Sequence, residues 1–145
     1  MDMDIQTTIQ MIYGQARLLG ACDLFKGTED LAGLVRLFKS PQGIEFCLRN
    51  NFPSLATLRL FKQYDIAQHG VYIDAGNIRL RNPDNAILIG RTIADVTCDT
   101  NEAHNIVLMQ GARAVLTARR WAVAFVKAGR GTSCIKAVYD NAIIM

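Results

Sequence analysis

Few residues in this 145-residue chain have the types and spacing that enzyme chemistry requires. Catalysis by a nucleophile, acid or base needs that group to be supported by partners, yet the chain has only two histidines, His69 and His104. Neither has a carboxylate or a cysteine at a spacing that suggests a catalytic pair. We interpret His69 as a residue that satisfies a turn and His104 as a solvated turn residue. We therefore expect no enzymatic activity and no cofactor.

Metal-ligand patterns are also lacking. Asp95, Asp99 and Glu102 fall around one predicted turn, and carboxylate oxygens there could collect a cation. Their spacing matches no EF-hand loop and no glycine-rich calcium repeat, so we favour a solvated loop. The cysteines lie more than 20 residues apart without a C-x-x-C pair or a nearby histidine to complete a zinc site. We expect four buried thiols, at Cys22, Cys47, Cys98 and Cys134.

Basic residues are the remaining candidates for binding. The segment "KAGRGTS" at Lys127–Ser133 lacks the G-x-x-x-x-G-K-[ST] pattern of a phosphate loop, and we interpret it as a wide turn. Arg79 and Arg81 alternate with apolar residues, so both point outward from one predicted strand. Stacked strands could align them with later arginines into a basic stripe for an acidic protein, a polyanion or RNA. The alternative is scattered surface charge. The candidate residues are Arg79, Arg81, Arg91, Arg113, Arg119 and Arg120.

The first half of the chain has the spacing of α-helices. Ile5, Ile9 and Ile12 begin an apolar face that recurs every three or four residues and ends near Gly20. Thr28 is the expected N-cap of a second helix over residues 29–39, and Ser40 with Pro41 begins a third. A fourth helix carries the stripe Leu55, Leu58 and Phe61. We predict a four-helix N-terminal unit that caps the second half of the chain.

The last two of these helices also have the outline of a helix-turn-helix. If the second helix of the hairpin at residues 41–64 entered a major groove, its polar residues would contact bases and phosphates. Residues 1–70 hold seven basic and seven acidic residues, and this balance gives little attraction to DNA. Nucleic-acid binding is therefore the alternative function rather than the favoured one. Its contact residues would be Thr57, Arg59, Lys62 and Gln63.

At Gly70 the pattern changes to short, alternating, β-branched segments such as "NIRLR", "TIADVTC" and "WAVAFV". No segment after Val71 serves as a crossover helix, and the hairpin dipeptides Asn-Gly and Asp-Gly are absent from this half. Four alanines recur at intervals of 17, 19 and 20 residues, which is typical of successive coils of a β-solenoid. They are Ala86, Ala103, Ala122 and Ala142.

We therefore predict an α+β fold, with a helical cap at residues 1–69 and a short single-stranded β-solenoid, or β-helix, at residues 70–145. A small β-sandwich or roll is the alternative. Alternation in "WAVAFV" places Trp121, Val123 and Phe125 on one face and the small residues on the other. We expect the small set to line the coil interior, and the large set to pack on the helical unit or on another chain.

Several stretches also resemble a known group of proteins. "FKSPQGIEFCLRNNFPSLATLRLFK", followed by "GVYIDAG", "ARAVLTARRWAVAFV" and "VYDNAIIM", is similar to small uncharacterised proteins from prophages and mobile elements of gut anaerobes. The similarity extends from about Leu31 to Met145. It implies a helical head, a β-solenoid body and a phage or mobile-element context, and it assigns no functional residues.

Composition limits the class of protein. Half of the residues are apolar and a fifth are charged, as in ordinary globular domains. The longest apolar runs are far shorter than a bilayer span, and the acidic N-terminus is unlike a secretory signal. The net charge of +3 is too weak to indicate nucleic acid. We expect a cytoplasmic protein without a membrane partner.

The apolar C-terminal segment "NAIIM" predicts self-association. A solenoid must be closed at both ends, because an open coil exposes unpaired backbone groups and an apolar interior. We expect a second copy to cover this segment in a symmetric homo-oligomer, most simply a dimer, in contact through Ile143, Ile144 and Met145. The favoured function is a non-catalytic structural or protein-interaction module, with another protein as a further potential partner.

Overall fold

The structure is a computed structural model that describes residues 4–21 and 23–145. The chain forms two compact units, residues 1–61 and 62–145. Helices occupy the N-terminal half, and parallel strands form a β-solenoid of about four turns in the C-terminal half. The predicted α+β fold with a solenoid body is therefore confirmed. The first strand begins at Val71, directly after the predicted change of pattern at Gly70.

Polar caps set the start of each α-helix. The helical unit contains α1 (Ile5–Leu18), α2 (Leu31–Lys39), α3 (Pro41–Asn50) and α4 (Leu55–Leu58). Ser40 and Pro41 begin α3 as predicted, with Ser40 Oγ accepting a hydrogen bond from the Gly43 N–H. The predicted cap of α2 is wrong, because Asp30 rather than Thr28 accepts from the Gly33 N–H, at 2.7 Å. No helix in the described residues is long and apolar enough to cross a membrane.

The second helix of the predicted hairpin is much shorter than expected. After four residues, α4 tightens into the 3-10 helix η1 (Arg59–Gln63), and a second 3-10 helix, η2 (Ile66–His69), follows. Thr57 is buried in α4 and its backbone N–H is bound by Ser54 Oγ. A continuous ten-residue recognition helix is therefore not formed.

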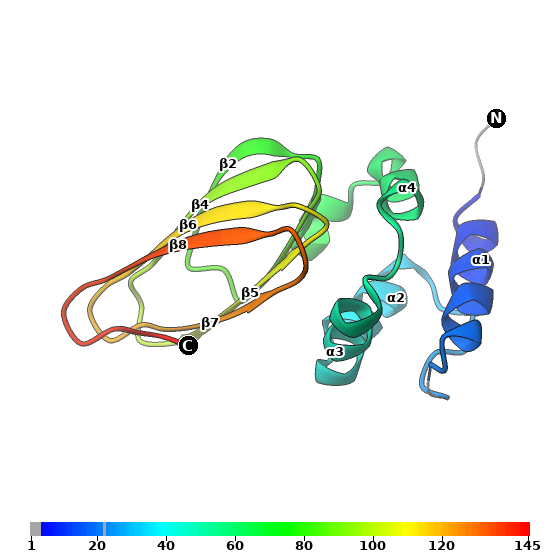
Figure 1. Ribbon diagram of the computed structural model, residues 1–145, viewed down its shortest axis with the longest axis horizontal. Helices are drawn as coiled ribbons and strands as arrows, with labels where there is room; N and C mark the ends of the chain where they lie inside the picture. The colour runs from blue at the N-terminus through cyan, green and yellow to red at the C-terminus, as the bar shows by residue number, and fades with distance from the viewer. Residues whose placement is uncertain (1–3, 22) are drawn as a thin grey trace. The chain divides into compact units, whose positions relative to one another are not determined.

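The solenoid consists of two parallel sheets whose strands alternate along the chain (Figure 1). One sheet has five strands in the order β1, β3, β5, β7, β9, and the other has four in the order β2, β4, β6, β8. The strands are β1 (Val71–Ile73), β2 (Gly76–Arg81), β3 (Asn85–Ile89), β4 (Thr92–Cys98), β5 (Ala103–Met109), β6 (Arg113–Ala118), β7 (Val123–Ala128), β8 (Ser133–Val138) and β9 (Ile143–Ile144).

The strand register gives the length of each coil. Val71 lies beside Ile87 and Gly76 beside Thr92, so the first coil contains 16 residues. From there the step is 20 residues in both sheets, as in the pair Val123 and Ile143. In the segment "KAGRGTS", residues 129–132 form the corner between β7 and β8, which confirms the turn for its centre, whereas its ends belong to the two strands.

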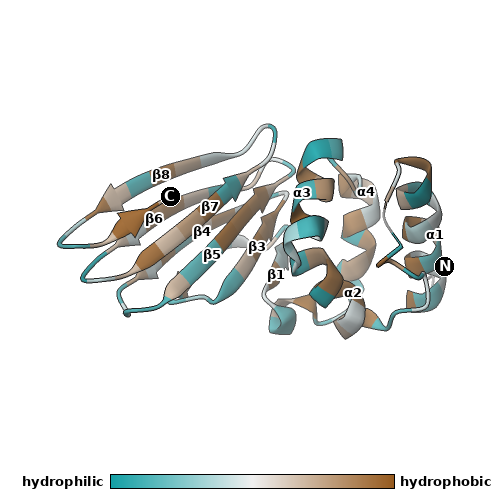
Figure 2. Ribbon diagram, turned by 90° about the horizontal axis from the view of Figure 1, so that it is seen from below, coloured by the Kyte–Doolittle hydropathy of each residue, from teal (hydrophilic) through white to brown (hydrophobic). Residues whose placement is uncertain are grey.

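Small and medium apolar side chains fill the interior of the coils. Ala94, Ala114 and Cys134 occupy one register position in three successive coils. The predicted alanine stack is correct only in part: Ala122 and Ala142 lie one coil apart, but Ala86 pairs with Ile106, and Ala103 is exposed beside Val123. From β3 onward every step is 20 residues, and the first two alanine intervals, 17 and 19, depart from it. In Figure 2, the most hydrophobic strands include β3 and β5.

The strand "WAVAFV" behaves as predicted on its small side. Ala122 and Ala124 are fully buried in the coil interior, and Val126 packs against the same core. Trp121 is not a strand residue, because it lies in the corner before β7 and is 62% exposed. Its packing against another chain stays a prediction.

Cysteine burial matches the expectation at two positions. Cys47 and Cys98 are buried, whereas Cys134 is half-buried in the last coil. Burial raises the pKa of the Cys47 thiol to about 12 and that of Cys98 to about 11, with the Asp99 charge adding to the second shift. Both thiols are therefore protonated and behave as small apolar groups. Cys22 lies outside the described residues.

Candidate functional site

The outer face of the four-stranded sheet carries the main group of charged side chains. Arg79 and Arg81 on β2 are exposed and alternate with the half-buried Ile78 and Leu80. The next strand places Asp95 beside Arg79 and Thr97 beside Arg81. The parallel register therefore brings cations, a carboxylate and a hydroxyl onto one face.

These side chains line a shallow hollow of about 380 Å³, which we call the outer-face hollow. Its walls come from β2, β4 and the corner after β6, so three successive coils contribute to it. The lining residues are Arg79, Leu80, Arg81, Asp95, Thr97, Asp99 and Arg119. Five of the seven carry a formal charge, three positive and two negative.

Asp99 holds one end of the outer-face hollow in place. Its carboxylate accepts hydrogen bonds from Asn82 Nδ2 at 2.8 Å and from Arg81 Nη2 at 2.7 Å. The Asn82 amide, followed by Arg81, holds the pKa of the Asp99 carboxyl below its ordinary value. The Asp99 side chain is only 13% exposed, whereas that of Arg81 is 75% exposed. Asp99 therefore stabilises the corner after β4 through its hydrogen bonds and leaves most of the Arg81 guanidinium accessible.

Arg119 forms the opposite side of the hollow. Its guanidinium carbon lies 4.3 Å from the centre of the Tyr139 ring, in a cation–π contact. This contact keeps the guanidinium beside the Tyr139 ring. No described residue accepts a hydrogen bond from its N–H groups, so these donors remain for another partner.

The six predicted arginines do not all lie together. Arg79, Arg81 and Arg119 line the outer-face hollow. Arg120, with a φ of 60°, lies in the adjacent corner and donates its backbone N–H to Asp140. Arg91 and Arg113 lie at the other ends of the strands, directly before β4 and at the start of β6. The sequence pattern predicted that Arg79 and Arg81 point outward from β2. It did not predict that Arg119 lies near them, because this depends on the strand register.

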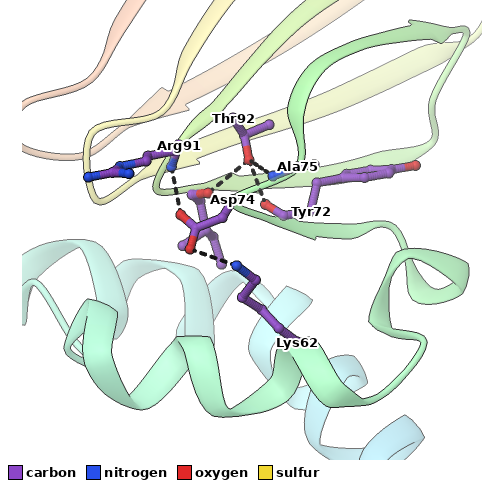
Figure 3. Close-up of polar contacts among 7 residues, drawn as sticks. Lys62, Tyr72, Asp74, Ala75, Arg91 and Thr92 are labelled. Carbon is purple, nitrogen blue, oxygen red and sulfur yellow. Dashed lines mark hydrogen bonds and ion pairs between the residues drawn. The ribbon is translucent and has the colours of Figure 1, made fainter.

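The residues proposed for groove binding lie in different settings. Thr57 is buried. Lys62 forms an ion pair with Asp74 across 3.3 Å, and the Asp74 carboxylate also accepts from the Arg91 N–H (Figure 3). Arg59 and Gln63 are exposed in η1. The corner at Asp74 is completed by Thr92 Oγ1, which lies 2.9 Å from the Ile89 carbonyl oxygen. These contacts make Lys62 part of a structural corner.

The three carboxylates considered as potential cation ligands lie in different settings. Asp95 points outward from β4, Asp99 is bound by Asn82 and Arg81, and Glu102 is exposed in the following corner. Among the described residues, no group of three histidine, cysteine, aspartate or glutamate side chains is placed to hold a metal ion.

The prediction for His104 is wrong. It begins the inward-facing series of β5 and is fully buried. Its Nδ1 lies 3.0 Å from the Pro83 carbonyl oxygen, and its Nε2 lies 3.2 Å from Thr100 Oγ1. Because both ring nitrogens have partners, the coil interior accommodates this polar side chain. His69 lies half-buried at the end of η2.

The last coil exposes a second group of residues, which are apolar. Ile143 points outward from β9 and is 52% exposed, whereas Ile144 continues the interior position of Ala124 and is half-buried. Met145 is exposed, although its backbone pairs with Ala124 and Val126 of β7. On β8, Ile135 is 68% exposed. The three predicted interface residues therefore differ, since Ile144 also closes the core.

Comparison of the chain with protein-family models, curated proteins and solved structures gives no match.

Proposed function

We propose that the chain is a non-catalytic protein-interaction module that associates with a second copy of itself through the last coil of its solenoid. The carrying observation is the combination of an edge strand, β9, with exposed apolar side chains at Ile143 and Met145. An edge strand has backbone N–H and C=O groups on one side that no neighbouring strand satisfies. A second copy would supply both the hydrogen bonds and the apolar cover.

The other edge strand of this coil is less suited to pairing. Lys136 on β8 occupies the register position that Leu116 and Val96 fill in the preceding coils. A charged residue at an inward position of an edge strand opposes pairing with another sheet, because its charge would have to be buried. This supports contact through β9, with a two-fold axis near Ile143 and Ile144.

The size of the contact sets a lower limit for stable association. Stable interfaces bury at least about 1,000 Å² of total surface. At that size we expect association at micromolar concentration or tighter. A phage or mobile-element setting, implied by the resemblance of the sequence, is the biological context that we propose for such an assembly.

Sedimentation velocity at tens of micromolar tests the proposal. We expect a dimer for the unchanged chain and an affinity weakened on the order of tenfold or more for Ile143→Lys. Ile143 is chosen because its side chain points away from the core, so circular dichroism should show an intact fold. Ile93→Lys, an equally exposed isoleucine on the outer face of β4, is the matched control.

A monomer at tens of micromolar, or a dimer that Ile143→Lys leaves unchanged, would contradict self-association. Nucleic-acid binding stays the alternative function. It has less support because Thr57 is buried and Lys62 pairs with Asp74. A titration with duplex DNA and with RNA at two salt concentrations tests it, and saturable binding abolished by Arg59→Ala would favour it.

A further inference from the structure

The outer-face hollow has a composition that differs from both an apolar docking surface and a purely basic patch. Arg79, Arg81 and Arg119 surround a floor that contains Asp95 and Thr97. We propose that this hollow binds an acidic saccharide, with the guanidinium groups on its carboxylates and the floor side chains on its hydroxyls. The proposal concerns the outer face of the four-stranded sheet rather than the edge strand β9, and it does not depend on self-association.

The cations are available for a carboxylate. Within the described part of the chain, Arg79 makes no hydrogen bond and no ion pair, and the guanidinium of Arg119 contacts only the Tyr139 ring. A guanidinium binds a carboxylate through two parallel N–H donors, which gives both strength and orientation. Arg79 lies on β2 and Arg119 directly after β6, the two strands that flank β4, so they approach a ligand on β4 from opposite sides.

The floor selects against a densely charged polyanion. Asp95 is exposed between Arg79 and Val115, and no described residue donates a hydrogen bond to its carboxylate. A phosphate backbone would meet this negative charge at close range, which is unfavourable. Sugar hydroxyls, by contrast, donate to a carboxylate and exchange hydrogen bonds with Thr97 Oγ1. A ligand with both hydroxyls and carboxylates therefore matches the charges better than RNA does.

The backbone argues against a peptide. β4 is hydrogen-bonded to β2 on one side and to β6 on the other, so its N–H and C=O groups are committed. Peptides that bind sheets usually add to a free edge, which this position does not offer. Beside Asp95, the exposed Val115 and Ile135 continue the same row. They provide an apolar strip for the C–H face of a sugar ring, as in most ligand sites that combine apolar contact with a few polar groups.

Isothermal titration with an oligomer of glucuronic acid tests the proposal, with a neutral glucose oligomer of the same length and a single-stranded RNA as further arms. We expect saturable binding of the acidic oligomer alone. Arg79→Gln should weaken it on the order of tenfold, because one charge-assisted contact is lost. Arg130→Gln, which removes the same charge from an exposed position in the β7–β8 corner, is the matched control and should bind normally.

Asp95→Asn separates the saccharide from a polyanion. Replacing the carboxylate by an amide should weaken saccharide binding, because charge-assisted hydrogen bonds from the hydroxyls become weaker neutral ones, whereas loss of a negative charge should strengthen RNA binding. Circular dichroism of Arg79→Gln and Asp95→Asn should match that of the unchanged protein, since neither Arg79 nor Asp95 has a hydrogen-bond or ion-pair partner among the described residues. No binding of the acidic oligomer at millimolar concentration, tighter binding of RNA, or an equal loss in Arg130→Gln would each overturn the proposal.

Discussion

The four-stranded and five-stranded sheets of the solenoid begin and end with different kinds of edge strand. In the four-stranded sheet, β2 carries Arg79 and Arg81, and β8 carries Lys136 at an otherwise apolar position. In the five-stranded sheet, β1 reads Val71–Ile73 and β9 reads Ile143–Ile144, without a charge in either strand. Charged edges discourage pairing with other sheets. Only the four-stranded sheet is therefore protected by its own side chains against pairing with other sheets.

This difference separates two surfaces in a single small unit. In the four-stranded sheet, charged side chains line the outer-face hollow, where Arg81 Nη2 lies 2.7 Å from Asp99 Oδ2. The other sheet leaves β9 as the place where a second copy would add. The two proposals therefore concern different strands and can fail independently.

A lysine placed one coil further inside the sheet than Lys136 should have the largest effect on stability. Leu116 fills the interior position directly below Lys136 and is fully buried. For Leu116→Lys we expect a loss of about 4 kcal/mol or more in the free energy of unfolding, because an unpaired charge would be buried. Urea denaturation measures the loss. Stability close to that of the unchanged chain would show that the coil interior is accessible to water.

Removing the edge charge should have a smaller effect in the opposite direction. Lys136→Leu continues the apolar series of Leu80, Val96 and Leu116. We expect the free energy of unfolding to rise by about 1 kcal/mol, since apolar contacts with the coil below are gained. Light scattering should also detect species larger than those of the unchanged chain, because β8 then lacks its protection. An unchanged mass would show that Lys136 does not protect β8.

The smallest effect concerns Asp99, which fixes Arg81 of the protected edge. Its pKa in the folded chain is below the ordinary value of 3.8, chiefly through the Asn82 and Arg81 hydrogen bonds. A lowered folded-state pKa contributes stability that is fully present above about pH 4 and is lost as the pH falls through the folded-state pKa. Asp99→Asn should therefore reduce the drop in unfolding free energy between pH 6 and pH 2, as measured by urea titrations. An identical drop in both proteins would contradict this role.

Local sequence signals predicted the elements well. The change from helical spacing to alternation at Gly70 and the cap at Ser40 depend only on neighbouring residues. The solenoid followed from the same signals, because short alternating strands without crossover helices or hairpin turns have few other arrangements. The inward position of Ala122 and Ala124 also followed from alternation alone.

Features that depend on register were not predicted. From β3 onward the step between coils is 20 residues, whereas the first two alanine intervals are 17 and 19, so Ala86 and Ala103 do not stack on each other or on Ala122. The burial of His104 leaves no local sequence signal, because its partners, the Pro83 carbonyl and Thr100 Oγ1, are brought to it only by the coil. The grouping of Arg119 with Arg79 likewise requires three coils to be in place. Alternation in "TIADVTC" would have placed Asp95 and Thr97 on the same face.

After the first coil every step is 20 residues, so each of these coils is a repeating unit of the solenoid. Residues 113–132 span one full step, and their inward positions include only small and apolar side chains such as Ala114, Leu116 and Ala124. A chain in which this segment is repeated would place the second copy of each residue directly above the first, because the register is the same in both sheets. Each repetition lengthens the solenoid by one strand spacing, about 4.8 Å. The length of the solenoid can therefore be changed by whole coils without altering either end.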